Sequence, residues 1–146
     1  MRGYAYRCTM KEKKERIFTM MFAMNKTLES FLENLYTDEL KKTVLLARAN
    51  GETLVEVGRK LGVTKEFVRQ TEAKITRKFA LSQSGRKILD SLANLDDSDV
   101  ACVPDNLKAY FGDHYSEMVY LLHLYKCSPF YDGVRLEDFV LREDED

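Results

Sequence analysis

The sequence predicts a mainly α-helical protein, a helical bundle that contains a helix-turn-helix and carries a small C-terminal helix plus β-hairpin extension. Three observations lead to this prediction. Apolar residues recur at intervals of three and four in several segments, which is the spacing of one helix face. Two of these helical segments meet at Gly62, with room between them only for a tight turn. Near the C-terminus, Asp132-Gly133 is a dipeptide typical of a type I′ hairpin turn.

The first segment with a helical period begins at Asn25 and ends near Tyr36. Four apolar residues share one face of it: Leu28, Phe31, Leu32 and Leu35. Residues 1–16 lack such a period and contain the charged run KEKKER, so we expect residues 1–24 to be a flexible leader that is frayed or partly helical. The apolar run 17–24 is short, contains Thr19 and has no small-residue cleavage site, which argues against a signal peptide.

Three further helices complete a compact four-helix unit. Thr37 or Asp38 can cap a helix that runs through Ala49 and is closed by Asn50-Gly51. Its expected inward residues are Leu40, Val44 and Ala47.

The third and fourth helices carry the clearest start and stop signals. Thr53 and Glu56 form a capping box, and Gly62 can take the left-handed conformation that ends the helix. Thr64 then caps a helix that extends to Phe79. The inward stripes of the two helices are Leu54, Val57 and Leu61, then Val68, Ile75 and Phe79.

The chain beyond Phe79 is expected to form one more short helix and an acidic extension. The fourth helix either continues or breaks at residues 82–85, and 86–95 is amphipathic, so we place one domain at residues 25–95. The Asp-rich stretch 95–105 is the expected linker.

Residues 96–141 make up the predicted extension. A helix is expected from Asn106 to Tyr125 with an interruption at Gly112, followed by a ribbon formed by 128–132 and 133–141. The acidic residues 142–146 are expected to be disordered.

The net charge of −1 conceals a strong asymmetry between the two halves of the chain. Residues 40–87 hold twelve Lys and Arg against four Asp and Glu, a balance of +8. Residues 88–146 hold four against fourteen, a balance of −10. A basic segment that coincides with the paired helices is the electrostatic signature of phosphate binding, although Lys and Arg also solvate helix faces in proteins of other kinds.

The same residues resemble a known family. The order E-V-G-x-x-L-G-V-T-x-E-x-V-R-Q-x-E-A-K-x-x-R-K, Glu56 to Lys78, is similar to region 4 of the sigma-70 family of bacterial RNA polymerase sigma factors, and the resemblance covers about Asp38 to Phe79. It implies a helix-turn-helix whose second helix reads promoter DNA, and it implies contact with the flap of the polymerase β subunit. Phe67 departs from the usual Arg, and Thr71 and Thr76 replace aliphatic residues.

The resemblance assigns base reading to Lys65, Glu66, Arg69 and Gln70. Their chemistry suits the task, because Lys and Arg donate to guanine, Gln bonds adenine and Glu accepts from cytosine. Thr64 is placed to hold a phosphate at the helix start. Phe67 is expected either to touch a thymine methyl or to belong to the core. Lys74, Arg77 and Lys78 would add phosphate contacts that are independent of sequence.

Other classes of function find less support. The sequence contains no catalytic triad, Cys-His pair or Gly-rich phosphate loop, so we expect neither an enzyme nor a cofactor. His114 and His123 lack metal-ligand spacing, and Asp96, Asp97 and Asp99 are read as caps or a solvated loop, so no metal is expected.

The expected partner is double-stranded DNA, in the cytoplasm. No apolar run reaches the ~20 residues that cross a bilayer, so no membrane partner is expected. Three scattered cysteines without a CxxC pair indicate reduced thiols: Cys8, Cys102 and Cys127.

We therefore predict a sequence-preferring DNA-binding protein, a transcription regulator or sigma-like accessory factor. Two alternatives stay open at this point. One is a protein-interaction module in which the helix-turn-helix is vestigial. The other is the DNA-binding fragment of a larger defence or mobile-element protein.

Overall fold

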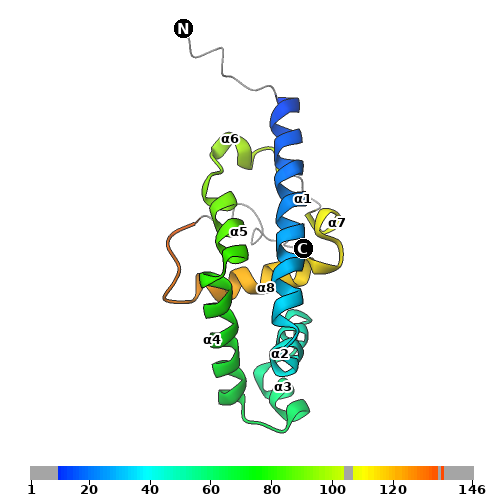
Figure 1. Cartoon of the computed structure of the whole chain (residues 1–146), viewed down its shortest axis with the longest axis vertical. Coiled ribbons are helices and arrows are strands. Elements are labelled where there is room, and N and C mark those ends of the chain that lie inside the picture. Colours follow the sequence, from blue (N-terminus) through cyan, green and yellow to red (C-terminus); the bar gives the residue numbers. More distant parts are fainter. Residues whose placement is uncertain (1–9, 104–106, 135, 137–146) are drawn as a thin grey trace.

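The protein is mainly helical, as predicted. The structure is a computed structural model and describes residues 10–103, 107–134 and 136. The helices, shown in Figure 1, are α1 (Met10–Leu35), α2 (Glu39–Ala49), α3 (Leu54–Leu61), α4 (Lys65–Leu81), α5 (Gln83–Ala93), α6 (Asp97–Val100), α7 (Leu107–Phe111), the 3-10 helix η2 (Gly112–His114) and α8 (Tyr115–Lys126).

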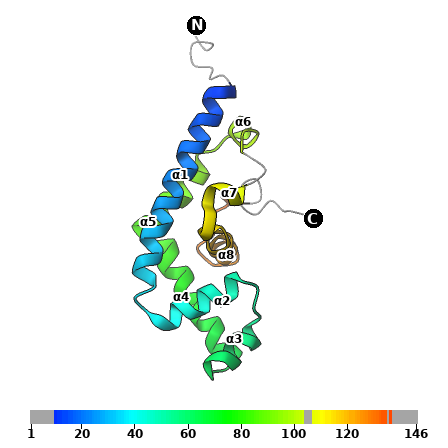
Figure 2. The same ribbon diagram turned by 90° about the vertical axis from the view of Figure 1, so that its right-hand side faces the viewer.

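The helices form an elongated bundle with the α3–α4 connection at one end. Helix α1 packs against α5. Helix α4, which directly precedes α5 in the chain, lies nearer the end with the α3–α4 connection and packs there against α2 and α3. Helix α8 lies across the middle of the molecule and contacts both α2 and α4. Figure 2, the view turned by 90°, shows α8 nearly end-on. The start of α4 is therefore far from the acidic helix α6 at the opposite end.

Helix α1 is longer than the sequence analysis predicted. We expected a flexible leader over residues 1–24, but the helix begins at Met10. Ile17, Met21 and Met24 are each at most 2% exposed, and they extend the buried stripe that Leu28 continues. Three residues of the apolar run 17–24 thus face the core, whereas Phe18 and Phe22 of the same run are 39% and 64% exposed. Residues 1–9 lie outside the described part of the chain.

The helix α2 was predicted correctly, including its caps. The Asp38 side chain accepts a hydrogen bond from the Lys41 backbone N–H at 3.2 Å, which fixes the first turn. Asn50 closes the helix, and Gly51 follows with a φ of 95°. Val44 and Ala47 are buried as expected, and Leu40 packs partly against the core.

Ser82 resolves whether the helix after Phe79 continues or breaks. It is both the C-cap of α4 and the N-cap of α5. Its backbone N–H donates to Lys78 O at 3.0 Å, while its hydroxyl oxygen accepts from Gly85 N at 2.8 Å. Gly85 leaves no room for a side chain, because a Cβ there would lie 1.7 Å from Phe79 O. The junction between α4 and α5 is consequently closely packed.

The expected linker is instead packed structure as far as Val103. Asp96 and Asp99 form a capping box at the start of α6, and Asp99 is only 6% exposed. The Asp99 carboxylate binds Arg16 at 2.7 Å and lies 3.6 Å from the Lys13 ammonium. A run of aspartates that resembles a solvated loop therefore ties α6 to α1. Residues 104–106 lie outside the described residues.

The C-terminal helix is interrupted where the sequence predicted, but no strand of the expected β-ribbon is present among the described residues. Gly112 has a φ of 57° and starts the 3-10 turn between α7 and α8. Residues 127–134 form turns and irregular chain, without a strand among those described. Gly133 has the positive φ of a turn residue, 95°, yet Tyr131 instead packs edge-on against Tyr125, with ring centroids 5.8 Å apart. Residues 137–146, which include most of the second predicted strand and the tail, fall outside the description.

Candidate functional site

The capping contacts predicted around the α3–α4 connection are present. Thr53 accepts from Glu56 N at 3.1 Å, and the Glu56 carboxylate accepts from Thr53 N at 2.8 Å. Gly62 ends α3 in the left-handed conformation, with φ 73° and ψ 32°. Thr64 then caps α4 by accepting from Phe67 N at 3.1 Å. Each contact fixes the direction of a helix end, so the angle between α3 and α4 is set locally.

A close approach of backbone to backbone tightens this connection. Val63 N donates to Gly58 O at 2.8 Å, and a Cβ at position 58 would lie 2.7 Å from Val63 O. Only glycine fits there without displacing the chain. Gly58 was part of the quoted sequence pattern, and the structure supplies its physical role.

The nine predicted site residues form one exposed strip along α4 and its cap. Eight are solvent-exposed, and Lys78 is half-buried: Thr64, Lys65, Glu66, Phe67, Arg69, Gln70, Lys74 and Arg77. The four base-reading candidates lie in the first two turns of α4, at the end of the molecule. The phosphate-contact candidates follow in the last three turns.

Two members of the strip, Glu66 and Arg69, interact with each other, and a third, Phe67, carries apolar surface. Glu66 Oε1 lies 3.0 Å from Arg69 Nη1 in an exposed ion pair one turn apart. Phe67 is 40% exposed, so it is not a core residue, which was one of the two interpretations of that position. Val55 on α3 is a second exposed apolar residue, at 48%.

The opposite face of α4 is fully packed. Val68, Ile75 and Phe79 are 0% exposed, as predicted, and Phe79 meets Phe31 of α1 edge-on at 5.4 Å. The two threonines that replace aliphatic residues are also buried. Their hydroxyls donate to backbone carbonyls one turn earlier, Thr71 to Phe67 O and Thr76 to Glu72 O. These bonds satisfy the hydroxyls, so threonine is tolerated on the packing face.

A buried polar cluster that the sequence analysis missed fixes α4 to two other helices. The Glu72 carboxylate accepts from Arg48 Nε of α2 at 2.6 Å and from the Tyr120 hydroxyl of α8. Burial and the adjacent Glu72 carboxylate raise the pKa of Tyr120. Arg48 also donates to Glu52 O at 2.8 Å. Glu72 is 6% exposed, so this is a structural contact that holds the strip in place.

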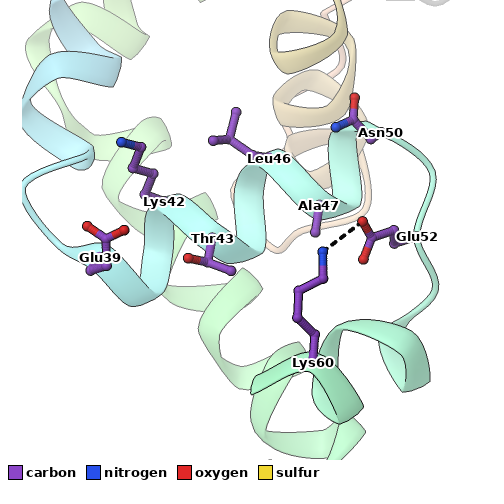
Figure 3. Close-up of a pocket in the computed structure, with 8 residues that line it drawn as sticks. All are labelled: Glu39, Lys42, Thr43, Leu46, Ala47, Asn50, Glu52 and Lys60. Atoms are coloured by element: carbon purple, nitrogen blue, oxygen red, sulfur yellow. Dashed lines mark hydrogen bonds and ion pairs between the residues drawn. The ribbon is translucent and has the colours of Figure 1, made fainter. Parts of the chain in front are cut away.

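A cleft of about 250 Å³ is lined by none of the strip residues. It opens between α2 and α3, where Lys60 binds Glu52 at 3.0 Å (Figure 3). The residues that line it are Glu39, Lys42, Thr43, Leu46, Ala47, Asn50, Glu52 and Lys60. Its lining carries two carboxylates, Glu39 and Glu52, and two ammonium groups, Lys42 and Lys60, so the charge of the cleft indicates no particular ligand.

The histidines and cysteines form no further site in the part of the chain that the structure describes. No group of three metal-ligating side chains comes together there. His114 lies between Glu29 and Glu117, with nitrogen–oxygen distances of 3.8 and 3.7 Å. Cys102 is buried and Cys127 is exposed, and neither forms a disulfide with a described residue. In the same residues, every helix is too short or too polar to span a bilayer.

Comparisons with protein-family models, with curated proteins and with solved structures gave no match for this chain.

Proposed function

We propose that α3 and α4 form a helix-turn-helix and that the protein binds double-stranded DNA with a sequence preference, as a transcription regulator or sigma-like accessory factor. The observation that carries the proposal is the exposed strip on α4. Hydrogen-bonding side chains of the kinds that read base edges protrude from a helix whose other face is buried. A recognition helix must present such groups on a rigid support in order to enter a major groove.

The position of the strip supports access to DNA. The α3–α4 connection is at one end of the elongated molecule, and α4 begins there (Figure 1). Lys65, Arg69 and Gln70 are exposed, so none of the described acidic residues of the C-terminal half covers them. A duplex can therefore approach this end without a rearrangement of the described fold.

The chemistry of the strip divides into two parts. In the first two turns, Arg69 and Gln70 offer paired donors and acceptors that match guanine and adenine edges. In the last three turns, Lys74, Arg77 and Lys78 supply positive charge that suits phosphates, which fix register but carry no sequence information. Glu66 holds the Arg69 guanidinium at 3.0 Å and so restricts its orientation before binding.

The buried cluster around Glu72 gives the strip its rigidity. It connects α4 to α2 and α8 at the third turn, between the base-reading and phosphate-contacting parts. Base readout depends on side chains held in a fixed register, and this contact limits rotation of α4. A contact with the polymerase β flap, which the sequence resemblance implies, stays a prediction.

The direct test is binding of the full chain to a random-sequence duplex over a range of salt concentrations, followed by fluorescence anisotropy. Each neutralised phosphate contributes a slope of about −0.9 in a plot of log K against log salt, so three or more contacts give a slope of about −3 or steeper. Selection of bound duplexes from a random pool then reports sequence preference.

Two results would contradict the proposal. The first is no DNA binding at low salt. The second is binding whose affinity does not change with salt, which would favour the alternative that the α3–α4 unit contacts protein instead.

A further inference from the structure

A second cleft adjoins the strip on the side that faces α8. Arg69, Ala73 and Arg77 recur every four residues along α4 and form one wall of a cleft of about 560 Å³. The other wall is Leu124 of α8 and the turn that follows it, with Pro129 and Phe130. Figure 1 shows this turn beside α4.

The walls of the cleft are mostly apolar. Leu124, Pro129, Phe130 and Ala73 contribute hydrocarbon surface, and Phe130 also packs partly against the core. Ligand sites for small molecules typically enclose 300–1,000 Å³ and combine apolar walls with a few polar groups. The cleft therefore fits a small molecule with an apolar body, rather than a bare ion.

The free charge at the cleft is positive. Arg77 is exposed, and no hydrogen bond or ion pair to its guanidinium is found among the described residues. Among the residues with a described structure, Arg69 forms an ion pair with Glu66 alone, at the exposed face of the helix. The one carboxylate in the lining, Glu72, is already bound by Arg48 and Tyr120. An anionic group on the ligand would thus meet a guanidinium without a competing carboxylate.

We propose that this cleft binds small organic carboxylates with an apolar tail or ring, and that such a ligand competes with DNA. The second part rests on the proposed function. Arg69 and Arg77 belong to both the cleft and the strip, so a carboxylate that engages them removes one base-reading group and one phosphate contact. Occupation of the cleft then weakens DNA binding, so the ligand acts as an effector that releases the protein from DNA.

The binding part is tested without DNA, by NMR titration of the full chain with octanoate and with 4-phenylbutyrate. Acetate carries the same charge without the tail, and octanamide carries the tail without the charge. We expect saturable shifts of the cleft amides by at least one of the two carboxylates, with a Kd of about 1 mM or tighter. Acetate is expected to cause no saturable shift.

Three variants separate a specific cleft from general electrostatic attraction. Arg77→Gln removes the charge and should weaken carboxylate binding about tenfold, because a charge-assisted hydrogen bond is lost, while octanamide binding is unchanged. Arg59→Gln is the matched control, since Arg59 is an exposed arginine of α3 outside the cleft. Ala73→Phe fills the cleft and should abolish binding. Non-saturable shifts, shifts centred elsewhere, or equal effects of Arg77→Gln and Arg59→Gln would overturn the proposal.

The coupling to DNA is measured separately, as the anisotropy Kd with saturating sodium octanoate or 4-phenylbutyrate against sodium acetate at the same concentration. We expect a higher Kd with the carboxylate that binds the cleft, and the difference should vanish in Ala73→Phe. Ligand binding without any effect on DNA affinity would overturn the coupling. A chain that binds carboxylate in the cleft but binds no DNA would refute the proposed function, but it would not refute the carboxylate site.

Discussion

Glu72 of α4 and Arg48 of α2 form a largely buried ion pair, with Oε2 and Nε 2.6 Å apart. The Tyr120 hydroxyl of α8 donates to the same carboxylate oxygen. Three helices that are distant in the sequence thus meet at one side chain. The exposed residues of α4 owe their orientation to this contact as much as to the apolar core behind them.

Replacement of Glu72 by Gln is expected to destabilise the fold by roughly 1–3 kcal/mol, because the Arg48 guanidinium loses its charged acceptor in a site shielded from water. Arg48 keeps its bond to Glu52 O, and its side chain is 26% exposed, so the cost stays below that of a fully buried pair. Urea unfolding followed by circular dichroism measures the difference in free energy of unfolding.

The matched control is Glu66→Gln, the same substitution on the same helix in an exposed pair with Arg69. Both side chains of that pair are more than half exposed, so the expected cost is at most about 0.5 kcal/mol. Equal effects of the two substitutions would show that the Glu72 contact adds nothing to stability.

The double substitution Arg69→Ala, Gln70→Ala should remove sequence preference and leave the fold intact. Each good bidentate base contact contributes about 1–3 kcal/mol of discrimination, so the ratio of selected to random duplex affinity should fall at least about tenfold. Lys74→Ala is the comparison variant, because loss of a phosphate contact weakens all duplexes alike and reduces the salt slope by about 1. If the double variant keeps the wild-type preference, α4 does not read bases through these residues.

Phe67 is expected to contact a thymine methyl. Since 40% of the residue is exposed, Phe67→Ala should cost only about 1–2 kcal/mol of stability. In a selected duplex, replacement of single thymines by deoxyuridine removes only the methyl group. One position should then lose about fourfold in affinity for the wild type and nothing for Phe67→Ala. If deoxyuridine at every position left the affinity of the wild type unchanged, Phe67 would not contact a thymine methyl.

Gly62→Ala should destabilise the protein by roughly 1–2 kcal/mol, because a residue with a Cβ is strained in the left-handed region. A Cβ at this position meets nothing within 4 Å, so the cost is purely conformational. Asn tolerates that region better, and Gly62→Asn should therefore recover part of the loss. Thermal unfolding of both variants checks the order. A loss as large in Gly62→Asn as in Gly62→Ala would point to a cause other than the backbone angle.

Stability is expected to fall in acid through two helix caps. The backbone N–H of Lys41 lowers the pKa of Asp38, and the backbone N–H of Asp99 lowers the pKa of Asp96, each from an ordinary value of 3.8. The folded state then binds fewer protons than the unfolded state near that pH. The stabilisation is complete above the unfolded-state pKa and is lost as the pH falls through it toward the lower folded-state pKa.

Asn is as good an N-cap as Asp but does not titrate. Asp38→Asn with Asp96→Asn should therefore reduce the loss of unfolding free energy between about pH 5 and about pH 3. Urea unfolding at both values gives the comparison with the wild type. A double variant as sensitive to acid as the wild type would show that these caps do not contribute.

Features that depend on neighbours in the sequence were predictable. Thr53 with Glu56, Gly62 and Thr64 each act within one helical turn, and all of them form the contacts that the residue types suggested. The helical spacing of Val68, Ile75 and Phe79 predicted which face of α4 is buried, and therefore which residues form the exposed strip. Its role in DNA binding stays a prediction.

Features that depend on distant partners were not predictable. The start of α1 was misplaced because the helices that cover Met21 and its neighbours come much later in the chain. Asp99 binds Arg16, 83 residues away, and Tyr120 binds Glu72, 48 residues away. The dipeptide Asp132-Gly133 was interpreted as a type I′ hairpin turn, which needs a positive φ at both residues, but of the two only Gly133 has one. A ribbon also needs a strand partner, which a dipeptide does not specify.

Because Ser82 closes one helix and opens the next, no spare residue between α4 and α5 can absorb a change in helix direction. A rotation of α4 would have to break the Ser82 bonds or carry α5 with it, and α5 is packed along α1. A displacement of α4 at the α3–α4 end is therefore expected to move α5 and to change how α5 packs on α1.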